Sequence, residues 1–250
     1  MLRSADRSWA RRRFERASRA YPGVVREAYH RQLDVLVGEL ADMSDMARGA
    51  MEDATTALLD VDLARSERVI GGDPRIDRAR TGCEHHAYAL IALQAPVATE
   101  LRTVLTTALA AEDLERMGDL ARHVAELVRL RHPAPVLPEE LRPLVTELHR
   151  SAVAVAEVAG QVIRTGDLVL ARSADTLDDD VDERHRELLR RIAGQEWRHG
   201  VRAAVDASLL GRYYERFADH AVSVCARMVY GITGRPPGGH TGGSRVTVAA

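Results

Sequence analysis

Two short segments of the chain each place a pair of carboxylates one helical turn apart. The sequence LERMGD, which holds Glu115 and Asp119, returns 100 residues later as YERFAD, which holds Glu215 and Asp219. On an α-helix, side chains four positions apart lie on the same face. Two carboxylates so placed can bind a hard or borderline metal ion. The same spacing also suits a solvated charged face paired with nearby arginines, so the pattern alone leaves both interpretations open.

The composition favours a helical globular chain and excludes several other classes. Of 250 residues, 46% are apolar but only 4% are aromatic, which favours a helical core over a β-sandwich. A net charge of −2 makes no general case for nucleic-acid binding, so none is expected. Cys83 and Cys225 match no metal or redox spacing, which is typical of a reduced cytosolic protein. The apolar run 87–99 contains Pro96 and is too short to span a bilayer.

Helical periodicity extends over most of the chain. Apolar residues recur every three or four positions, and proline- or glycine-containing turns interrupt the pattern. Pro74 should kink or divide the second helix, whereas Pro96 suits the start of the third. The turns at 59–62 and 165–167 each offer an aspartate that could cap the next helix. The expected helices cover residues 26–58, 63–93, 96–131, 139–164, 168–193 and 200–232.

These six helices form two sets of three, and the two sets repeat one another. The sequence therefore predicts an all-α fold of two pseudo-symmetric three-helix bundles. The expected organisation is an Arg-rich disordered arm at 1–25, a first bundle at 26–131, a Pro-rich linker at 132–138, a second bundle at 139–233 and a Gly/Pro-rich disordered tail at 234–250. The arm could also contact an anionic membrane, or could precede a true start at Val25.

A helical wheel separates the repeated acids from the apolar row of their own helix. The third helix carries an apolar row that the sixth helix repeats in register, and Glu115 and Asp119 point nearly opposite to it. We therefore expect the acids on an outer face or over a neighbouring helix, with any bound metal near the surface. The two rows are Leu114, Met117, Ala121, Val124 and Val128, and Tyr214, Phe217, Ala221, Val224 and Met228.

Four motifs, taken together and in order, resemble the PhoU family of cytoplasmic regulators of bacterial phosphate uptake. They are YHRQL at 29–33, ALLDVDLA at 57–64, QAPVATELR at 94–102 and the duplicated LERMGD. The second copy keeps the acids but changes their neighbours. The resemblance implies two pseudo-symmetric three-helix bundles, no catalysis and a homodimer. In some members it also implies multinuclear iron or zinc clusters on acidic pairs with this spacing.

The resemblance assigns candidate roles to individual residues. The acids that match the motif are Glu115, Asp119, Glu215 and Asp219, and pairs with the same spacing that could complete each site are Asp73, Asp77, Asp178 and Asp182. Apart from the resemblance, Arg102 and Arg202 recur at helix starts and are expected to hold a neighbouring helix or carboxylate, with phosphate contact as an alternative. Arg116 and Arg216 are expected to serve structure or partner contact, as ion-pair partners of the repeated acids.

Three functions follow as hypotheses. The resemblance implies a non-enzymatic adaptor that couples a phosphate ABC transporter, through its ATPase, to a phosphate-sensing histidine kinase. Such an adaptor would repress the phosphate-starvation response, and would be cytoplasmic and held at the inner membrane face by its partners. A ferritin-like di-metal oxidase is an alternative, but that fold needs Glu and Glu-x-x-His ligands facing into a four-helix core. Here the repeated acids lack the Glu-x-x-His partners, and the helices come in threes. A metal-free helical scaffold is the third.

Overall fold

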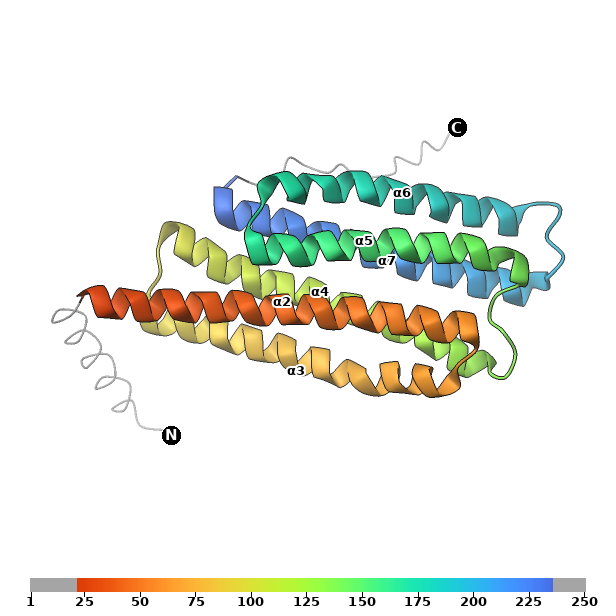
Figure 1. Cartoon of the computed structure of the whole chain (residues 1–250), viewed down its shortest axis with the longest axis horizontal. Coiled ribbons are helices and arrows are strands. Elements are labelled where there is room, and N and C mark those ends of the chain that lie inside the picture. Colours follow the sequence, from red (N-terminus) through yellow and green to blue (C-terminus); the bar gives the residue numbers. More distant parts are fainter. Residues whose placement is uncertain (1–21, 236–250) are drawn as a thin grey trace, which may run out of the picture.

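Helices α2 to α7 make up nearly all of the computed structural model, which describes residues 22–235 and side chains from Glu27 onward (Figure 1). No strand occurs within this described part of the chain, and the expected all-α class with two three-helix bundles is confirmed. The elements are α2 (Pro22–Asp60), α3 (Leu63–Gln94), α4 (Ala98–Arg131), η1 (Glu139–Leu141), α5 (Arg142–Thr165), α6 (Leu168–Ala193) and α7 (Gly200–Thr233).

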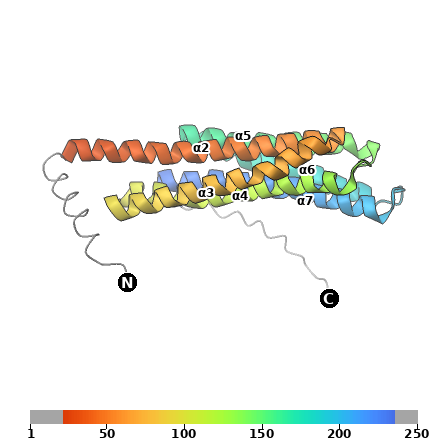
Figure 2. The ribbon, with the colours of Figure 1, turned by 90° about the horizontal axis from the view of Figure 1, so that it is seen from below.

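The two helical triplets are joined along two contacts between helices. Helix α4 packs against α7, and α2 packs against α5, while the other extensive contacts between helices lie within each triplet. Helices α4 and α7 run in opposite directions along one side of the molecule, with α2 and α5 along the other (Figures 1 and 2). Helices α4 and α7 are equivalent in the repeat, as are α2 and α5. Because each of these pairs packs antiparallel, an approximate twofold axis relates the two triplets.

The apolar rows expected on α4 and α7 form the centre of the core. Leu114 and Met117 on α4 and Tyr214 and Phe217 on α7 are all fully buried. Burying these rows removes apolar surface from water and stabilises the bundles.

Two expected helix starts are wrong, and of the two expectations for Pro74, a kink or a division, the division does not occur. Helix α2 begins at Pro22 and not at Arg26, because proline is favoured in a first turn, where its missing N–H is not needed. Helix α3 runs through Pro74 without division, since Val69 and Ile76 on either side are buried against the core and hold the helix in register. Pro96 lies outside α4, which begins at Ala98 after an extended Val97.

Side-chain caps fix the starts of two helices as the turns predicted. Asp62 accepts a hydrogen bond from the backbone N–H of Arg65 at 2.9 Å. Asp167 accepts from the N–H groups of Val169 and Leu170 at 2.8 and 3.1 Å. Each cap pairs backbone donors that the first helical turn leaves free.

The remaining connections and ends complete the description. Residues 132–138 form a non-helical connection between α4 and η1, and the division into separate domains around it stays a prediction. Most of the expected arm and tail, residues 1–21 and 236–250, lies outside the described part of the chain. None of the described helices combines the length and apolar character that crossing a bilayer demands.

Candidate metal centre

The first acidic cluster lies along the seam between α3 and α4, and Arg122 occupies its centre. Nε of Arg122 lies 2.9 Å from Oδ2 of Asp73 on α3. The two terminal nitrogens of the same side chain donate to Asp119 at 2.9 Å and to Glu126 at 2.8 Å, both on α4. One guanidinium therefore contacts three carboxylates from two helices, which its planar array of donors allows.

Glu115 and Asp77, the other two predicted acids of this cluster, make weaker contacts. Arg116 donates to Asp119 at 3.1 Å, and its Nε lies 3.5 Å from Glu115. Asp77 is exposed and acts on Glu115 only through its charge. The structure therefore gathers all four predicted acids at one seam, but Asp77 stays at its edge.

The pKa values in the first cluster show that arginine neutralises its centre. Burial raises the pKa of Glu115, and the neighbouring charge of Asp119 adds to this. Burial also raises the pKa of Asp73, against the attraction of Arg122. Burial acts in the same direction on Asp119, but hydrogen bonds from Arg122 and Arg116 outweigh it and hold the pKa of Asp119 below its ordinary value.

The second acidic cluster lies between α6 and α7 and lacks such a central cation. Oδ1 of Asp178 is buried and has no hydrogen-bond partner within the described chain. Burial, together with the charges of Asp219, Asp182 and Glu215, raises the pKa of Asp178 to about 7. Burial likewise raises the pKa of Glu215, and the charge of Asp219 adds to that effect. Asp219 is exposed as a residue. Partial burial of its carboxyl group and the charge of Asp182 nevertheless raise its pKa.

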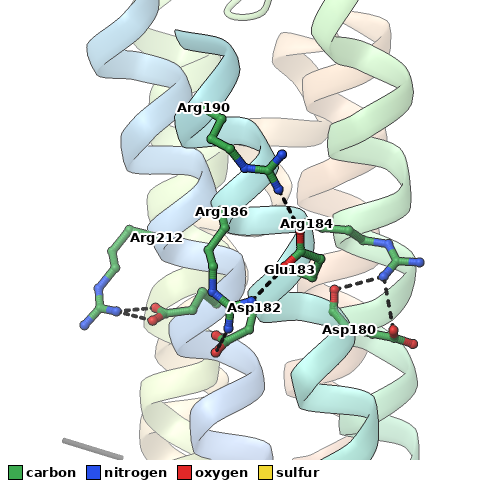
Figure 3. A network of polar contacts seen from close by, with 8 residues as sticks. Asp180, Asp182, Glu183, Arg184, Arg186, Arg190 and Arg212 are labelled. Carbon is green, nitrogen blue, oxygen red and sulfur yellow. Dashed lines mark hydrogen bonds and ion pairs between the residues drawn. The ribbon is translucent and has the colours of Figure 1, made fainter. Parts of the chain in front are cut away.

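Arginines near the second cluster pair with Asp182 and Glu183 on α6 and with Glu215 on α7 (Figure 3). Arg186 donates to Asp182 and to Glu183, each at 2.9 Å. Arg190 donates to Glu183 at 2.6 Å. On α7, Arg212 forms an ion pair with Glu215. Arginines therefore hold Asp182 and Glu215 of this cluster, while Oδ1 of Asp178 has no partner within the described chain.

The residues of the second cluster fit a metal ion better than those of the first. Within residues 22–235, no group of three or more His, Cys, Asp or Glu side chains is already placed to hold a metal. In the first cluster Arg122 takes the carboxylate oxygens that a metal would need, so these residues do not fit one. In the second cluster Arg186 holds Asp182 and Arg212 holds Glu215, but Oδ1 of Asp178 has no partner within the described chain, and an oxygen donor suits a hard cation.

The four candidate arginines have different positions. A methyl group on Gly234, just after α7, would lie 3.1 Å from Cζ of Arg102, so Arg102 covers the end of that helix. Arg116 bridges acids in the first cluster, as above. Arg202 and Arg216 are exposed. No described contact links any of them to a phosphate-binding loop.

Sequence reasoning missed the ion pairs that join α4 to α7. Buried Asp206 accepts two hydrogen bonds from Arg131, and buried Asp113 accepts from Arg227 at 2.5 Å and lies 3.1 Å from Nδ1 of His220. The available signal was the position of Asp113 and Asp206 within the apolar periodicity of their helices. An acid at a core position needs a buried partner.

Comparisons with known proteins agree with this architecture. The family model described as the PhoU domain matches twice, at residues 40–128 and 145–228. In Mycobacterium tuberculosis, the phosphate-specific transport system accessory protein PhoU homolog 1 is 43% identical over 85% of this chain and 96% of that protein. Homolog 2 from the same organism is 44% identical over 85% of this chain and all of that protein. Identity therefore does not separate the two paralogues.

A solved structure shows the same fold. The phosphate transport system regulatory protein PhoU from Streptococcus pneumoniae superposes with a TM-score of 0.76 at 23% identity, covering 83% of this chain and 98% of that one.

Proposed function

This chain belongs to the PhoU family, and we propose that it is an accessory protein of phosphate transport that represses the phosphate-starvation response. It acts without catalysis, by contacting the ATPase of a phosphate ABC transporter and a phosphate-sensing histidine kinase. The observation that carries the proposal is the family match in both triplets, together with relatives of this name that align over almost their whole length.

A coupling protein must bind two states of a partner unequally, because a ligand shifts an equilibrium only by its difference in affinity. Long helical faces suit this task. On α4, Leu105 and Leu109 are 45% and 46% exposed, and on α7, Val205 and Leu209 are 50% and 39% exposed. The two pairs occupy equivalent positions of the repeat, 100 residues apart. Each triplet therefore offers an equivalent apolar surface for partner contact.

A genetic experiment tests the repressor role. All PhoU paralogues are deleted from the host, and alkaline phosphatase activity is measured in high phosphate, with and without a copy of this gene. We expect constitutive phosphatase in the deletion strain and restored repression with the gene. Repression that persists without any paralogue, or that this gene does not restore, would contradict the role.

Direct binding tests the partners and the assembly. The purified protein is titrated against the transporter ATPase and against the cytoplasmic part of the kinase, and its mass is measured by light scattering. We expect binding to both partners and a homodimer, and a cytoplasmic protein recruited to the inner membrane face only when the partners are present. A Leu105→Ser, Leu109→Ser variant should bind more weakly with an unchanged circular dichroism spectrum.

We also propose that any iron or zinc lies in the second cluster, held by Asp178, Asp182, Glu215 and Asp219. The unpartnered oxygen of Asp178 supports this placement. Metal content is measured on untagged protein purified without added metal. The Glu215→Gln, Asp219→Asn variant should lose the metal, whereas the Glu115→Gln, Asp119→Asn variant should keep it. Equal retention in both variants would remove the assignment.

The oxidase and the metal-free scaffold stay as alternatives. The acids lie at helix seams within each triplet and not in a four-helix core, which does not favour the oxidase. Sustained oxygen consumption with ferrous iron would support an oxidase and count against the adaptor. Metal-free wild-type protein that still restores repression would support the scaffold.

A further inference from the structure

We infer that Arg122 is the permanent cation of the first acidic cluster, and that this cluster is an ion-pair lock between α3 and α4 where the family resemblance would have placed a metal. The proposed regulatory function does not depend on this ion-pair lock.

The guanidinium group of Arg122 is fully engaged by carboxylates of α3 and α4. All three guanidinium nitrogens are used, on Asp73 of α3 and on Asp119 and Glu126 of α4, at 2.8 to 2.9 Å. The side chain of Asp73 is 14% exposed and that of Asp119 is 22% exposed. Partly buried acids so close together repel one another, and a shared guanidinium removes that repulsion while satisfying their oxygens.

The internal repeat supplies a comparison within the same molecule. At the positions 100 residues later, Arg122 and Glu126 are replaced by Val222 and Ala226. The second cluster therefore has acids at the same register but no arginine at the position of Arg122. Its arginines hold single acids, Arg212 on Glu215 and Arg186 on Asp182, and Asp178 keeps an unpartnered buried oxygen. The half with Arg122 joins acids of two helices through one guanidinium, and the half with Val222 does not.

The helices approach closely at the lock. A methyl group on Gly118 would lie 2.7 Å from Cδ1 of Ile76, so α4 and α3 are near contact between the acidic pairs. This short spacing lets a side chain from α4 reach Asp73 across the seam. It also makes the seam sensitive to any unbalanced charge, because the acids cannot move apart without separating the helices.

The experiment measures thermal unfolding in metal-free buffer containing EDTA. Arg122→Val, which copies the residue of the second half, is compared with Arg129→Val. Arg129 also reaches from α4 to α3, but its ion pair with Glu67 is 3.8 Å long and both side chains are about half exposed. We expect Arg122→Val to lower Tm by about 4 °C or more, and Arg129→Val to lower it by about 1 °C or less.

A double-mutant cycle keeps the inference testable if Arg122→Val unfolds. Asp73→Asn is combined with Arg122→Lys, which keeps the charge but cannot contact three carboxylates at once. If Arg122 is the lock, the two single losses in Tm do not add in the double variant. Additive losses, or an Arg122→Val variant as stable as Arg129→Val, would overturn the inference. Because metal is excluded throughout, neither outcome depends on the regulatory role or on the second cluster.

Discussion

Arg131, the last residue of α4, forms a two-point ion pair with the buried carboxylate of Asp206 on α7. Its Nε and Nη2 groups donate to Oδ2 and Oδ1 of Asp206 at 2.7 and 2.9 Å, and Asp206 is only 3% exposed. The equivalent positions in the repeat hold Thr106 and Gly231, which pack so closely that a methyl group on Gly231 would lie 2.6 Å from Oγ1 of Thr106. The two triplets therefore meet by an ion pair at one end and by close packing at the other.

Removing Arg131 alone should cost more stability than removing both members of this pair. Arg131→Met leaves a buried carboxylate without its partner, whereas Arg131→Met with Asp206→Leu replaces both charges by apolar groups. We expect Arg131→Met to lower Tm by about 4 °C or more, and the double variant to recover most of that loss. Calorimetry at pH 7.5 measures the cycle. If the double variant were less stable than Arg131→Met, the loss in Arg131→Met could not come from an unpaired buried carboxylate, and the prediction would be wrong.

Much of the fold could be predicted from the sequence because the helical signal is long and repeated. The apolar rows that contain Leu114 and Tyr214 are buried as expected, and the helix class and bundle arrangement are confirmed. Periodicity works here because a core-facing stripe must recur with the helical repeat wherever it is buried. Pro74 does not divide α3, because tertiary packing holds the helix together through a residue that weakens an isolated helix.

The candidate site was predictable only in part. Spacing placed Glu115 and Asp119 on one face, and the structure brings Asp73 to the same seam. Spacing could not show that Arg122 reaches across to Asp73, because contacts between helices depend on rotation and separation that the sequence does not state. The comparison of Arg122 with Val222 was available in the sequence, but it becomes informative only once the surrounding acids are located.

Gly211 should be intolerant of a methyl group although it lies inside a helix. That group would lie 2.8 Å from Cδ2 of Leu188 and 2.9 Å from Cδ2 of His185, so these side chains or the helices α6 and α7 would have to shift. We expect Gly211→Ala to destabilise the protein by about 1–2 kcal/mol, because overpacking exceeds the gain in helix propensity. Gly38→Ala on α2, where nothing lies within 4 Å, is the control and should stabilise by about 0.5–1 kcal/mol. Urea unfolding measures both, and equal gains would contradict the close α6–α7 contact.

Arg102 and Arg202 should differ in effect although the repeat makes them equivalent. Arg102 lies against Gly234 at the end of α7 and donates to Thr99 at 2.9 Å, whereas Arg202 is exposed. A cation near the C-terminus of a helix is stabilising because it faces the negative end of the helix dipole. We expect Arg102→Ala to lower stability by about 1 kcal/mol and Arg202→Ala to change it by less than about 0.5 kcal/mol. Equal losses in urea unfolding would show that Arg102 does not support α7.

A buried contact between the triplets predicts a loss of stability in acid. Oγ1 of Thr55 on α2 lies 3.0 Å from Nδ1 of His149 on α5 and 2.7 Å from the hydroxyl of Tyr214 on α7. Burial lowers the pKa of His149 from 6.5 to about 4, and the charge of Arg150 adds to this. Above pH 6.5 neither the folded nor the unfolded state binds this proton, so the full stability is present.

Between pH 6.5 and pH 4 the unfolded chain binds a proton at His149 that the folded protein does not, so stability falls with falling pH. The total loss from this group is about 3 kcal/mol. His149→Asn keeps a polar atom near Thr55 but does not titrate, so its stability should change less over this range. We therefore expect the difference in unfolding free energy between wild type and His149→Asn to shrink as the pH falls from 7 to 4. Because all other groups are shared, parallel curves over that range would show that His149 is protonated in the folded protein and that its surroundings admit water.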